Sequence, residues 1–310
     1  MSQNESFTPE EISKMLKVSK LTVYDLIKKG HIPAFRVGRQ MRVDAKELEV
    51  YKTQSATGSD SHSNSNVAGK ISPIQKKPES MVISGQDASL DLLVHHLELE
   101  NGHRPFLRSH SGSLDSLIEM YKGNADIVST HLFDGDTQTY NIPYIRKLLV
   151  SKPFIVLQFI KRQAGFYVAE GNPKKITSWG DLSNPNLQFI NREAGAGARV
   201  LLDEQLRLHQ IPKENLKGYR NTRTSHMDIA SEIANGHADV GLGIEHIAKV
   251  APVDFIPMIE ESYDLVVLRT PENKRIIDTL HTILQQKKFQ EKLTSFGYHI
   301  KGIGTVLWEQ

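Results

Sequence analysis

The sequence predicts an α/β protein in which a large body follows a small, mainly helical head. Three observations lead to this prediction. Short apolar strands alternate with amphipathic helices from residue 81 onward, a glycine-rich turn joins one such strand to its helix at residues 191–199, and a polar, low-complexity stretch precedes the whole region. Alternating strands and helices favour parallel sheets that are covered by helices on both faces.

The composition is that of an ordinary soluble chain. With 310 residues, of which 39% are hydrophobic and 24% charged, there is room for two or three domains with apolar cores. No apolar run approaches the roughly 20 residues that span a bilayer, and the N-terminus has no signal-peptide pattern. We therefore expect a cytoplasmic protein. The chain has no cysteine, which excludes disulfides and thiolate metal sites.

Three segments are expected from composition: a head over residues 1–53, a flexible linker over residues 54–78 and a body over residues 79–310. The linker consists largely of Ser, Asn, Gly, Lys and Pro, which cannot form a core. Residues 1–78 carry 13 basic and 8 acidic residues, whereas the remainder is slightly acidic. This asymmetry is a mild indication of nucleic-acid binding by the head.

Two short helices joined by a tight turn are predicted in the head. Thr8 can cap a helix that begins at Pro9, and Ser19 can cap a second helix that Gly30 ends. This is the helix-turn-helix pattern, and the second helix would expose Lys20, Thr22, Tyr24 and Lys28 toward phosphates and base edges. Two short strands around a glycine-containing turn follow within residues 32–43 and present Arg36, Arg39 and Arg42; a closing helix begins at Asp44.

The head resembles the excisionase and MerR-type family of winged helix-turn-helix domains over about residues 6–53. The residues that carry the resemblance are 18–24 (VSKLTVY), 30–34 (GHIPA) and 36–39 (RVGR). It implies that the second helix enters the major groove of DNA and that the hairpin is a wing whose arginines contact phosphate or the minor groove. One departure is Asp25, which stands where the family usually has a basic residue.

The glycine-rich turn of the body suits a small anion. Gly195 and Gly197 are expected to take positive φ, and the free amides of the following helix, with Ala198 and Leu201 on its buried face, would point at the ligand. Two further strands end in small-residue turns, at Ser84-Gly85 and at residues 111–113. Such turns meet at the carboxyl edge of an open α/β sheet.

The body resembles cytoplasmic members of the type II periplasmic-binding-protein fold, in particular the domain related to molybdate- and tungstate-binding proteins, over about residues 80–300. The motifs that carry the resemblance lie at residues 111–114, 123–127, 131–134, 140–141, 189–192, 195–199, 238–243, 254–257 and 261–265. It implies two lobes with mixed, mainly parallel sheets, a hinge near residues 154–160 and 251–258, and an oxyanion bound between the lobes without a metal.

By this resemblance the candidate ligand-binding residues are Ser84, Gly85, Ser111, Gly112, Ser113, His131, Asn191, Arg192, Gly195, Gly197 and Ala198. The family loop usually carries hydroxyls where this chain has Ala196 and Ala198. Either backbone amides suffice for the oxyanion, or the ligand is larger, for example a molybdopterin-type compound.

The sequence gives less support to a metal site or to an enzyme function. The 13 histidines include no pair spaced i, i+4 in a confident helix, and there is no nucleophile elbow, Walker loop or His-Glu-x-x-His motif. Asp239 is the best candidate for a general base. We expect no catalytic residue, no metal and no cofactor other than an oxyanion effector.

The sequence thus predicts a one-component transcriptional regulator that binds double-stranded DNA as a homodimer and senses a small anion, molybdate or tungstate first. The alternative is a DNA-binding protein whose body binds a larger ligand or serves only dimerisation. An enzyme built on the periplasmic-binding fold is a third, less favoured class.

Overall fold

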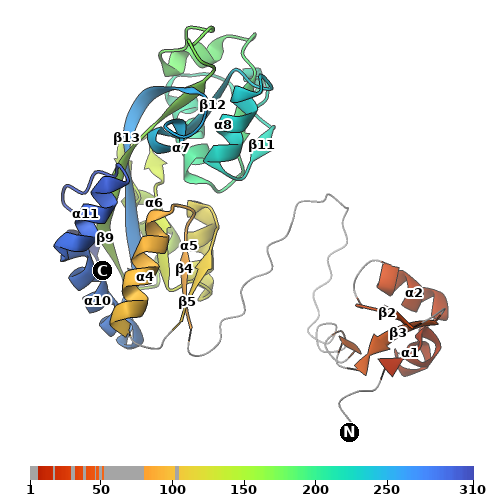
Figure 1. Cartoon of the computed structure of the whole chain (residues 1–310). Coiled ribbons are helices and arrows are strands. Elements are labelled where there is room, and N and C mark those ends of the chain that lie inside the picture. Colours follow the sequence, from red (N-terminus) through yellow and green to blue (C-terminus); the bar gives the residue numbers. More distant parts are fainter. Residues whose placement is uncertain are drawn as a thin grey trace. The chain divides into compact units, whose positions relative to one another are not determined.

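The computed structural model describes residues 6–16, 18–28, 32–37, 40–45, 47–48, 51, 80–101 and 105–310 (Figure 1). The chain divides into two compact units, Met1–Ile71 and Ser72–Gln310, and each is described by itself. The linker predicted over residues 54–78 lies outside the described residues.

The N-terminal unit is a helix-turn-helix with a small antiparallel sheet. Its elements are β1 (Ser6–Phe7), α1 (Pro9–Leu16), α2 (Lys20–Lys28), β2 (Phe35–Val37) and β3 (Gln40–Asp44). The strands are ordered β1-β3-β2, so β2 and β3 form the predicted wing. The two-residue strand β1 was not predicted, because so short a segment shows no alternation. The buried core consists of Ile12, Val23, Ile32, Val43 and Leu48.

Both predicted helix caps of this unit are present. Thr8 and Glu11 form a capping box, in which the Thr8 amide donates to Glu11 Oε2 at 2.8 Å and the Glu11 amide donates to Thr8 Oγ1 at 3.4 Å. Ser19 Oγ accepts from the Thr22 amide at 3.1 Å. These bonds satisfy amides of the first helical turns, so α1 and α2 begin where the sequence indicates. The predicted helix end at Gly30 lies outside the described residues.

The body is built on one mixed sheet, which confirms the predicted α/β fold class. Within residues 80–101 and 105–310, eight of its nine strands follow the order β11-β10-β12-β9-β13-β6-β4-β5, and the ninth, β14, pairs with β9. Their bounds are β4 (Met81–Ser84), β5 (Phe106–Ser109), β6 (Ile127–Thr130), β9 (Phe154–Val168), β10 (Phe189–Arg192), β11 (Thr222–Arg223), β12 (Val240–Ile244), β13 (Asp254–Leu268) and β14 (Val306–Glu309).

Pairing is parallel at the two ends of the sheet and antiparallel in the middle, where β9 and β13 pair along almost their whole length. A separate hairpin is formed by β7 (Phe133–Asp134) and β8 (Thr139–Tyr140). The helices are α4 (Ser89–Asn101), α5 (Ser113–Lys122), α6 (Ile142–Leu148), α7 (Gly197–Leu208), α8 (His226–Ala234), α9 (Glu245–Ala248), α10 (Lys274–Gln285) and α11 (Lys287–Ser295). Three 3-10 segments, Trp179–Ser183, Lys213–Asn215 and Pro271–Asn273, complete the set.

Two lobes share this sheet, and Figure 1 shows β9 and β13 running from one lobe into the other. The first lobe contains β4, β5 and β6, and the second contains β10, β11 and β12. β9 pairs with β14 up to Leu157 and with β12 from Ala164 onward, so the crossing lies between these residues. The crossing therefore lies a few residues later than predicted, at the polar interruption of an otherwise apolar strand.

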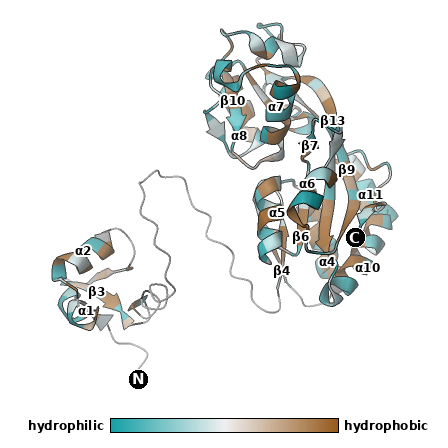
Figure 2. Ribbon diagram, turned by 180° about the vertical axis from the view of Figure 1, so that it is seen from behind, coloured by the Kyte–Doolittle hydropathy of each residue, from teal (hydrophilic) through white to brown (hydrophobic). Residues whose placement is uncertain are grey.

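Successive strand residues face opposite sides of the sheet and fill different cores. In the first lobe Met81 and Ile83 pack with α4, α10 and α11, whereas Val82 packs with α5 and α6. In the second lobe Phe189 packs with α7 and Ile190 with α8. Figure 2 shows the hydrophobic colour concentrated on the sheet strands. This packing fixes where each strand ends, and hence where the turns between strands and helices lie.

The described helices include none that is long and apolar enough to cross a membrane.

Candidate functional site

Three of the predicted DNA contacts on the second helix of the head are exposed. The side chains of Lys20, Thr22 and Tyr24 are exposed, while Val23 between them is buried. Lys20 forms an ion pair with Glu10 of α1, and Thr22 Oγ1 lies 2.8 Å from Ser19 Oγ. The Lys20 ammonium is thus held at the junction of the two helices.

The structure describes only some of the predicted wing residues. Arg42 on β3 donates from Nη1 to the backbone oxygen of Ser6 at 3.2 Å, so it joins the wing to β1. The backbones of Lys28 and Arg36 lie in α2 and β2. Arg39 lies outside the described residues.

The two lobes of the body touch at the N-terminal end of α5. The Leu114 amide donates to the Gly195 carbonyl at 3.0 Å, and a Cβ at Gly112 would lie 2.7 Å from that oxygen. Gly195 has φ +86°, and a Cβ there would lie 2.6 Å from Asp115 Oδ2. Glycine is needed at both positions for this approach. The structure therefore brings together two of the turns that the sequence placed at one sheet edge.

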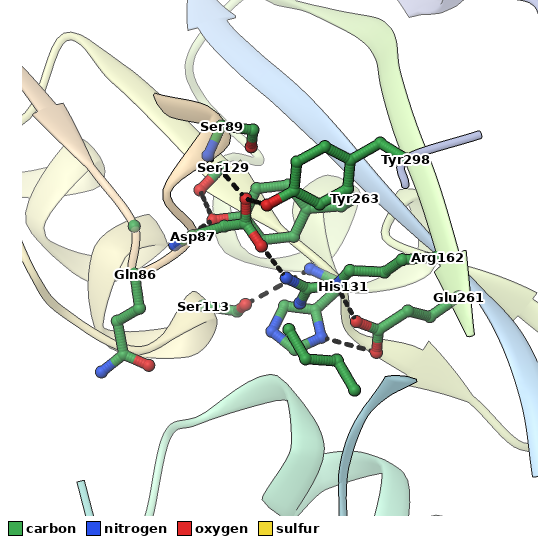
Figure 3. Close-up of polar contacts among 12 residues, drawn as sticks. Gln86, Asp87, Ser89, Ser113, Ser129, His131, Arg162, Glu261, Tyr263 and Tyr298 are labelled. Carbon is green, nitrogen blue, oxygen red and sulfur yellow. Dashed lines mark hydrogen bonds and ion pairs between the residues drawn. The ribbon is translucent and has the colours of Figure 1, made fainter. Parts of the chain in front are cut away.

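A buried guanidinium lies at the point where β9 crosses between the lobes (Figure 3). Arg162 is 5% exposed and forms ion pairs with Asp87, which follows β4, and with Glu261 on β13. Arg162 and Glu261 are direct register partners on the two long strands. One side chain thus ties the first lobe to both crossing strands.

A histidine and two tyrosines surround this ion-pair cluster. His131 Nδ1 lies 3.0 Å from Glu261 Oε2, and the Tyr298 hydroxyl donates to Asp87 Oδ1 at 2.7 Å. The Arg162 guanidinium carbon lies 4.5 Å from the centre of the Tyr263 ring, a cation–π contact. In Figure 3 these side chains converge on Arg162.

The cluster is charged at neutral pH. Burial is the largest influence and by itself would raise the pKa of Asp87 and of Glu261. Arg162 acts together with hydrogen bonds from Ser89 and Tyr298 at Asp87, and together with His131 at Glu261, and holds both pKa values below their usual range. Burial would lower the pKa of Arg162, yet Glu261 and Asp87 raise it. Burial, and then the charge of Asp87, raises the pKa of Tyr263 to about 12, so this phenol stays neutral.

Ser84 and Gly85 lie at the carboxyl end of β4, where the sequence placed them, and both are engaged inside the first lobe. Ser84 Oγ lies 2.8 Å from Ser116 Oγ. Gly85 has φ +146°, and a Cβ there would lie 1.9 Å from Ser129 Oγ. A side chain at position 85 would therefore displace Ser129.

Of the other serines of the predicted site, Ser113 lies next to His131. Ser111 Oγ lies 3.2 Å from Ser109 Oγ, and Ser113 Oγ accepts from the His131 amide at 3.3 Å. Ser113 and His131 are both buried, so the predicted serine turn and the predicted histidine belong to one polar layer.

In the second lobe, Asn191 and Arg192 occupy the end of β10. Asn191 Nδ2 donates to the Tyr219 carbonyl at 3.1 Å. The Arg192 side chain is 3% exposed and donates to both carboxylate oxygens of Glu193, at 2.8 Å each. Its Nη2 also donates to Gln86 Oε1 at 2.5 Å, across the lobe boundary.

The expectation for Gly197 is corrected. Gly195 has the positive φ that was predicted, but Gly197 does not, and it is the first residue of α7. Its lack of a side chain makes room for the His131 ring. Ala198 packs into the apolar core of the second lobe.

Sequence reasoning did not select Asp87, Arg162 or Glu261 as site residues. The available signal was that Arg162 and Glu261 interrupt long strands that are otherwise largely apolar. A charge in such a strand requires a buried partner, but its identity depends on the strand register.

Several buried polar atoms of the body have no hydrogen-bond partner in the described part of the chain, among them Thr130 Oγ1, Tyr140 Oη and His226 Nδ1. Burial, together with Glu261, raises the pKa of Tyr140. Burial, together with Arg192 and Arg162, lowers the pKa of His226 well below its usual range. Both groups are therefore neutral. Because buried polar groups are nearly always paired, unpartnered atoms of this kind are candidate contacts for a bound molecule.

Asp239, the candidate general base, has a structural partner. Its Oδ2 accepts from the Gln188 amide at 2.8 Å, which links the starts of β10 and β12. Among the described residues, no group of three or more His, Asp or Glu side chains is placed to hold a metal ion.

Comparisons with known proteins match both units. The PBP superfamily domain matches residues 94–285, and a helix-turn-helix domain matches residues 6–56. The Bacillus subtilis protein YvgK is 45% identical over 316 aligned residues, which cover 100% of both chains.

Solved structures show the same fold at low identity. A Clostridium perfringens substrate-binding protein with bound phosphate is 13% identical, with a TM-score of 0.52 over 73% of this chain and 99% of that chain. PhnD1 from Prochlorococcus marinus, in complex with methylphosphonate, is 14% identical, with a TM-score of 0.52 over 74% of this chain and 94% of that chain. With a two-lobed body, a helix-turn-helix head and a relative matched from end to end, the chain belongs to the PBP superfamily, in a form that carries a DNA-binding helix-turn-helix domain.

Proposed function

We propose that this protein is a one-component transcriptional regulator whose body binds a small oxyanion between its two lobes. The observation that carries the proposal is the pair of buried, unpartnered atoms Tyr140 Oη and His226 Nδ1 close to the Arg162 cluster, with His226 also close to Arg192. In a chain that also carries a DNA-binding head, a ligand that changes the balance between lobe arrangements would change DNA occupancy.

Neutral donors and arginine suit an oxyanion. Tyr140 is a neutral hydroxyl donor, and the neutral His226 imidazole has an N–H on one ring nitrogen. Arg192 presents two donor atoms in a fork that matches two oxygens of one anion. The solved relatives that hold phosphate and methylphosphonate support an anion of this size.

Molybdate and tungstate are the first ligands we propose, with phosphate and phosphonates beside them. The test is a thermal-shift screen of the full chain against molybdate, tungstate, sulfate, phosphate and methylphosphonate. An anion at 100 times its Kd stabilises the native state by about 2.7 kcal/mol. A selective rise in Tm supports the proposal. No shift with any anion would contradict it and favour a body that binds a larger ligand or serves dimerisation.

The DNA side of the proposal is tested separately. Duplexes selected from a random pool by the full chain would define the operator, and anisotropy titrations with and without the stabilising anion would measure the coupling. We propose a homodimer, because half-site recognition by helix-turn-helix proteins is usually paired. Light scattering of the purified chain would show a mass near 70 kDa, about twice the 34.9 kDa of one chain.

A further inference from the structure

The Arg192 guanidinium is occupied by its own neighbour in sequence. Nε donates to Glu193 Oε2 and Nη2 donates to Glu193 Oε1, both at 2.8 Å, so the carboxylate meets the guanidinium through two parallel bonds. Nη2 also donates to the Thr224 carbonyl at 3.0 Å. A carboxylate in this position uses the pair of donors that an oxyanion would use.

Gln86 extends this contact across the lobe boundary. It belongs to the turn after β4 in the first lobe, and its Nε2 donates to Glu193 Oε1 at 3.1 Å. Its Oε1 accepts from Arg192 Nη2 at 2.5 Å. The three side chains form a closed ring of hydrogen bonds in which Gln86 contacts both partners of the ion pair.

The charge of Glu193 also reaches the first lobe. Burial raises the pKa of Asp115, and the charge of Glu193 raises it further. Asp115 lies at the N-terminal end of α5, where its carboxylate would touch a Cβ at Gly195. An anion that entered beside Arg192 would meet the same repulsion from Glu193 unless this carboxylate moved away.

We propose that Glu193 is an internal competitor for the ligand: its carboxylate occupies Arg192 and, through Gln86, holds the lobes together until an oxyanion takes its place. This inference rests on the proposed function. By this inference, Glu193 sets how tightly an anion must bind in order to displace its carboxylate. It also limits the ligands to those with two oxygens that can bridge Arg192 Nε and Nη2.

The first test compares anion affinity between variants of the full chain. Inorganic phosphate and molybdate are titrated calorimetrically into wild type, Glu193→Gln and the control Glu214→Gln, which removes an exposed carboxylate of the same lobe. We expect Glu193→Gln to bind the anion at least tenfold more tightly and Glu214→Gln to match wild type. Equal or weaker binding by Glu193→Gln would overturn the competitor role.

The second test needs no ligand. Because the chain has no cysteine, spin labels can be attached at Glu98→Cys in the first lobe and Lys213→Cys in the second, both exposed. We expect Gln86→Ala and Glu193→Gln each to move the distance between the labels to longer, broader values than in wild type. Unchanged distances in both variants would overturn the closing role. If no anion binds any variant, the oxyanion proposal fails and the competitor role fails with it. The label distances then test only whether Gln86 and Glu193 hold the lobes together.

Discussion

Gly197 lies against the imidazole of His131: a Cβ built on this glycine would stand 2.6 Å from His131 Cε1. His131 cannot readily retreat, because its Nδ1 is held at 3.0 Å by the buried Glu261. Gly197, the first residue of α7 in the second lobe, therefore packs against His131, which belongs to the ion-pair cluster around Arg162.

Gly197→Ala should destabilise the body by about 1–3 kcal/mol, the usual cost of forcing extra volume into a packed site. Urea denaturation of the full chain measures the loss. Gly180→Ala is the matched control, because a Cβ there would meet only Ser178 Oγ at 3.7 Å. If His131 is the obstacle, the double variant with His131→Ala will lose less than the sum of the two single losses. Strict additivity would place the strain elsewhere.

Arg162→Met should destabilise the body more than Gly197→Ala does, because it leaves the carboxylates of Asp87 and Glu261 buried without their counter-charge. Breaking a buried ion pair in this way costs about 3–5 kcal/mol. Without Arg162 the pKa of both carboxyls rises, so protonation near pH 5 should recover part of the loss. Unfolding free energies at pH 5 and pH 7.5 check this, and an equal loss at both pH values would contradict it.

In the wild type, Asp264 gives a pH dependence opposite to that of Asp87 and Glu261, whose pKa values lie below their usual range. Burial, which outweighs a hydrogen bond from Asn141, raises its pKa to about 7. The folded state then holds a proton that the unfolded state releases near pH 4, so this contribution to stability falls as pH rises from about 4 to 7. A displacement of about three pKa units corresponds to roughly 4 kcal/mol.

Asp264→Asn removes this titration and keeps an oxygen that accepts from Asn141 Nδ2, now 2.7 Å from Asp264 Oδ2. The stability of the variant relative to wild type should rise between pH 5 and pH 8, because wild type loses stability over that range as Asp264 ionises. Taking the difference between the two proteins cancels the other titrating groups. A difference that does not change between pH 5 and pH 8 would mean that Asp264 is ionised in the folded state throughout.

Local patterns were sufficient for much of the fold. The caps Thr8 and Ser19 lie where the sequence indicated, because a cap depends on residues within one turn. The strand before the glycine-rich turn runs over Phe189–Arg192 and so extends into the predicted turn, and it does not include Leu187, because the Leu187 amide is used in a turn with Asn184. Boundaries of this kind depend on hydrogen bonds that periodicity does not reveal.

The ion-pair cluster of Asp87, Arg162 and Glu261 could not be predicted from local sequence patterns. Asp87 and Arg162 are 75 residues apart, and Arg162 and Glu261 are 99 apart. Their meeting depends on the register of β9 against β13 and on the position of β4, which are properties of the whole sheet. The turn at residues 111–113 and the loop at 195–197 were placed together correctly in the prediction, because open α/β sheets share one functional edge. The use of Arg192 by Glu193 could not be foreseen from that rule.

In the head, Lys20 connects the two helices through its ion pair with Glu10. If Lys20 reads a base edge, Lys20→Ala should weaken binding to the selected operator about tenfold or more and weaken binding to a scrambled duplex much less. Glu10→Gln should strengthen binding to both duplexes, because it frees the ammonium of Lys20 and removes a negative charge near phosphate.

The matched control is Lys14→Ala, which removes an exposed lysine of α1. Anisotropy titrations at fixed salt measure all four proteins. An equal loss on operator and scrambled DNA would assign Lys20 to phosphate, and unchanged binding by Glu10→Gln would mean that the ion pair does not restrain the lysine.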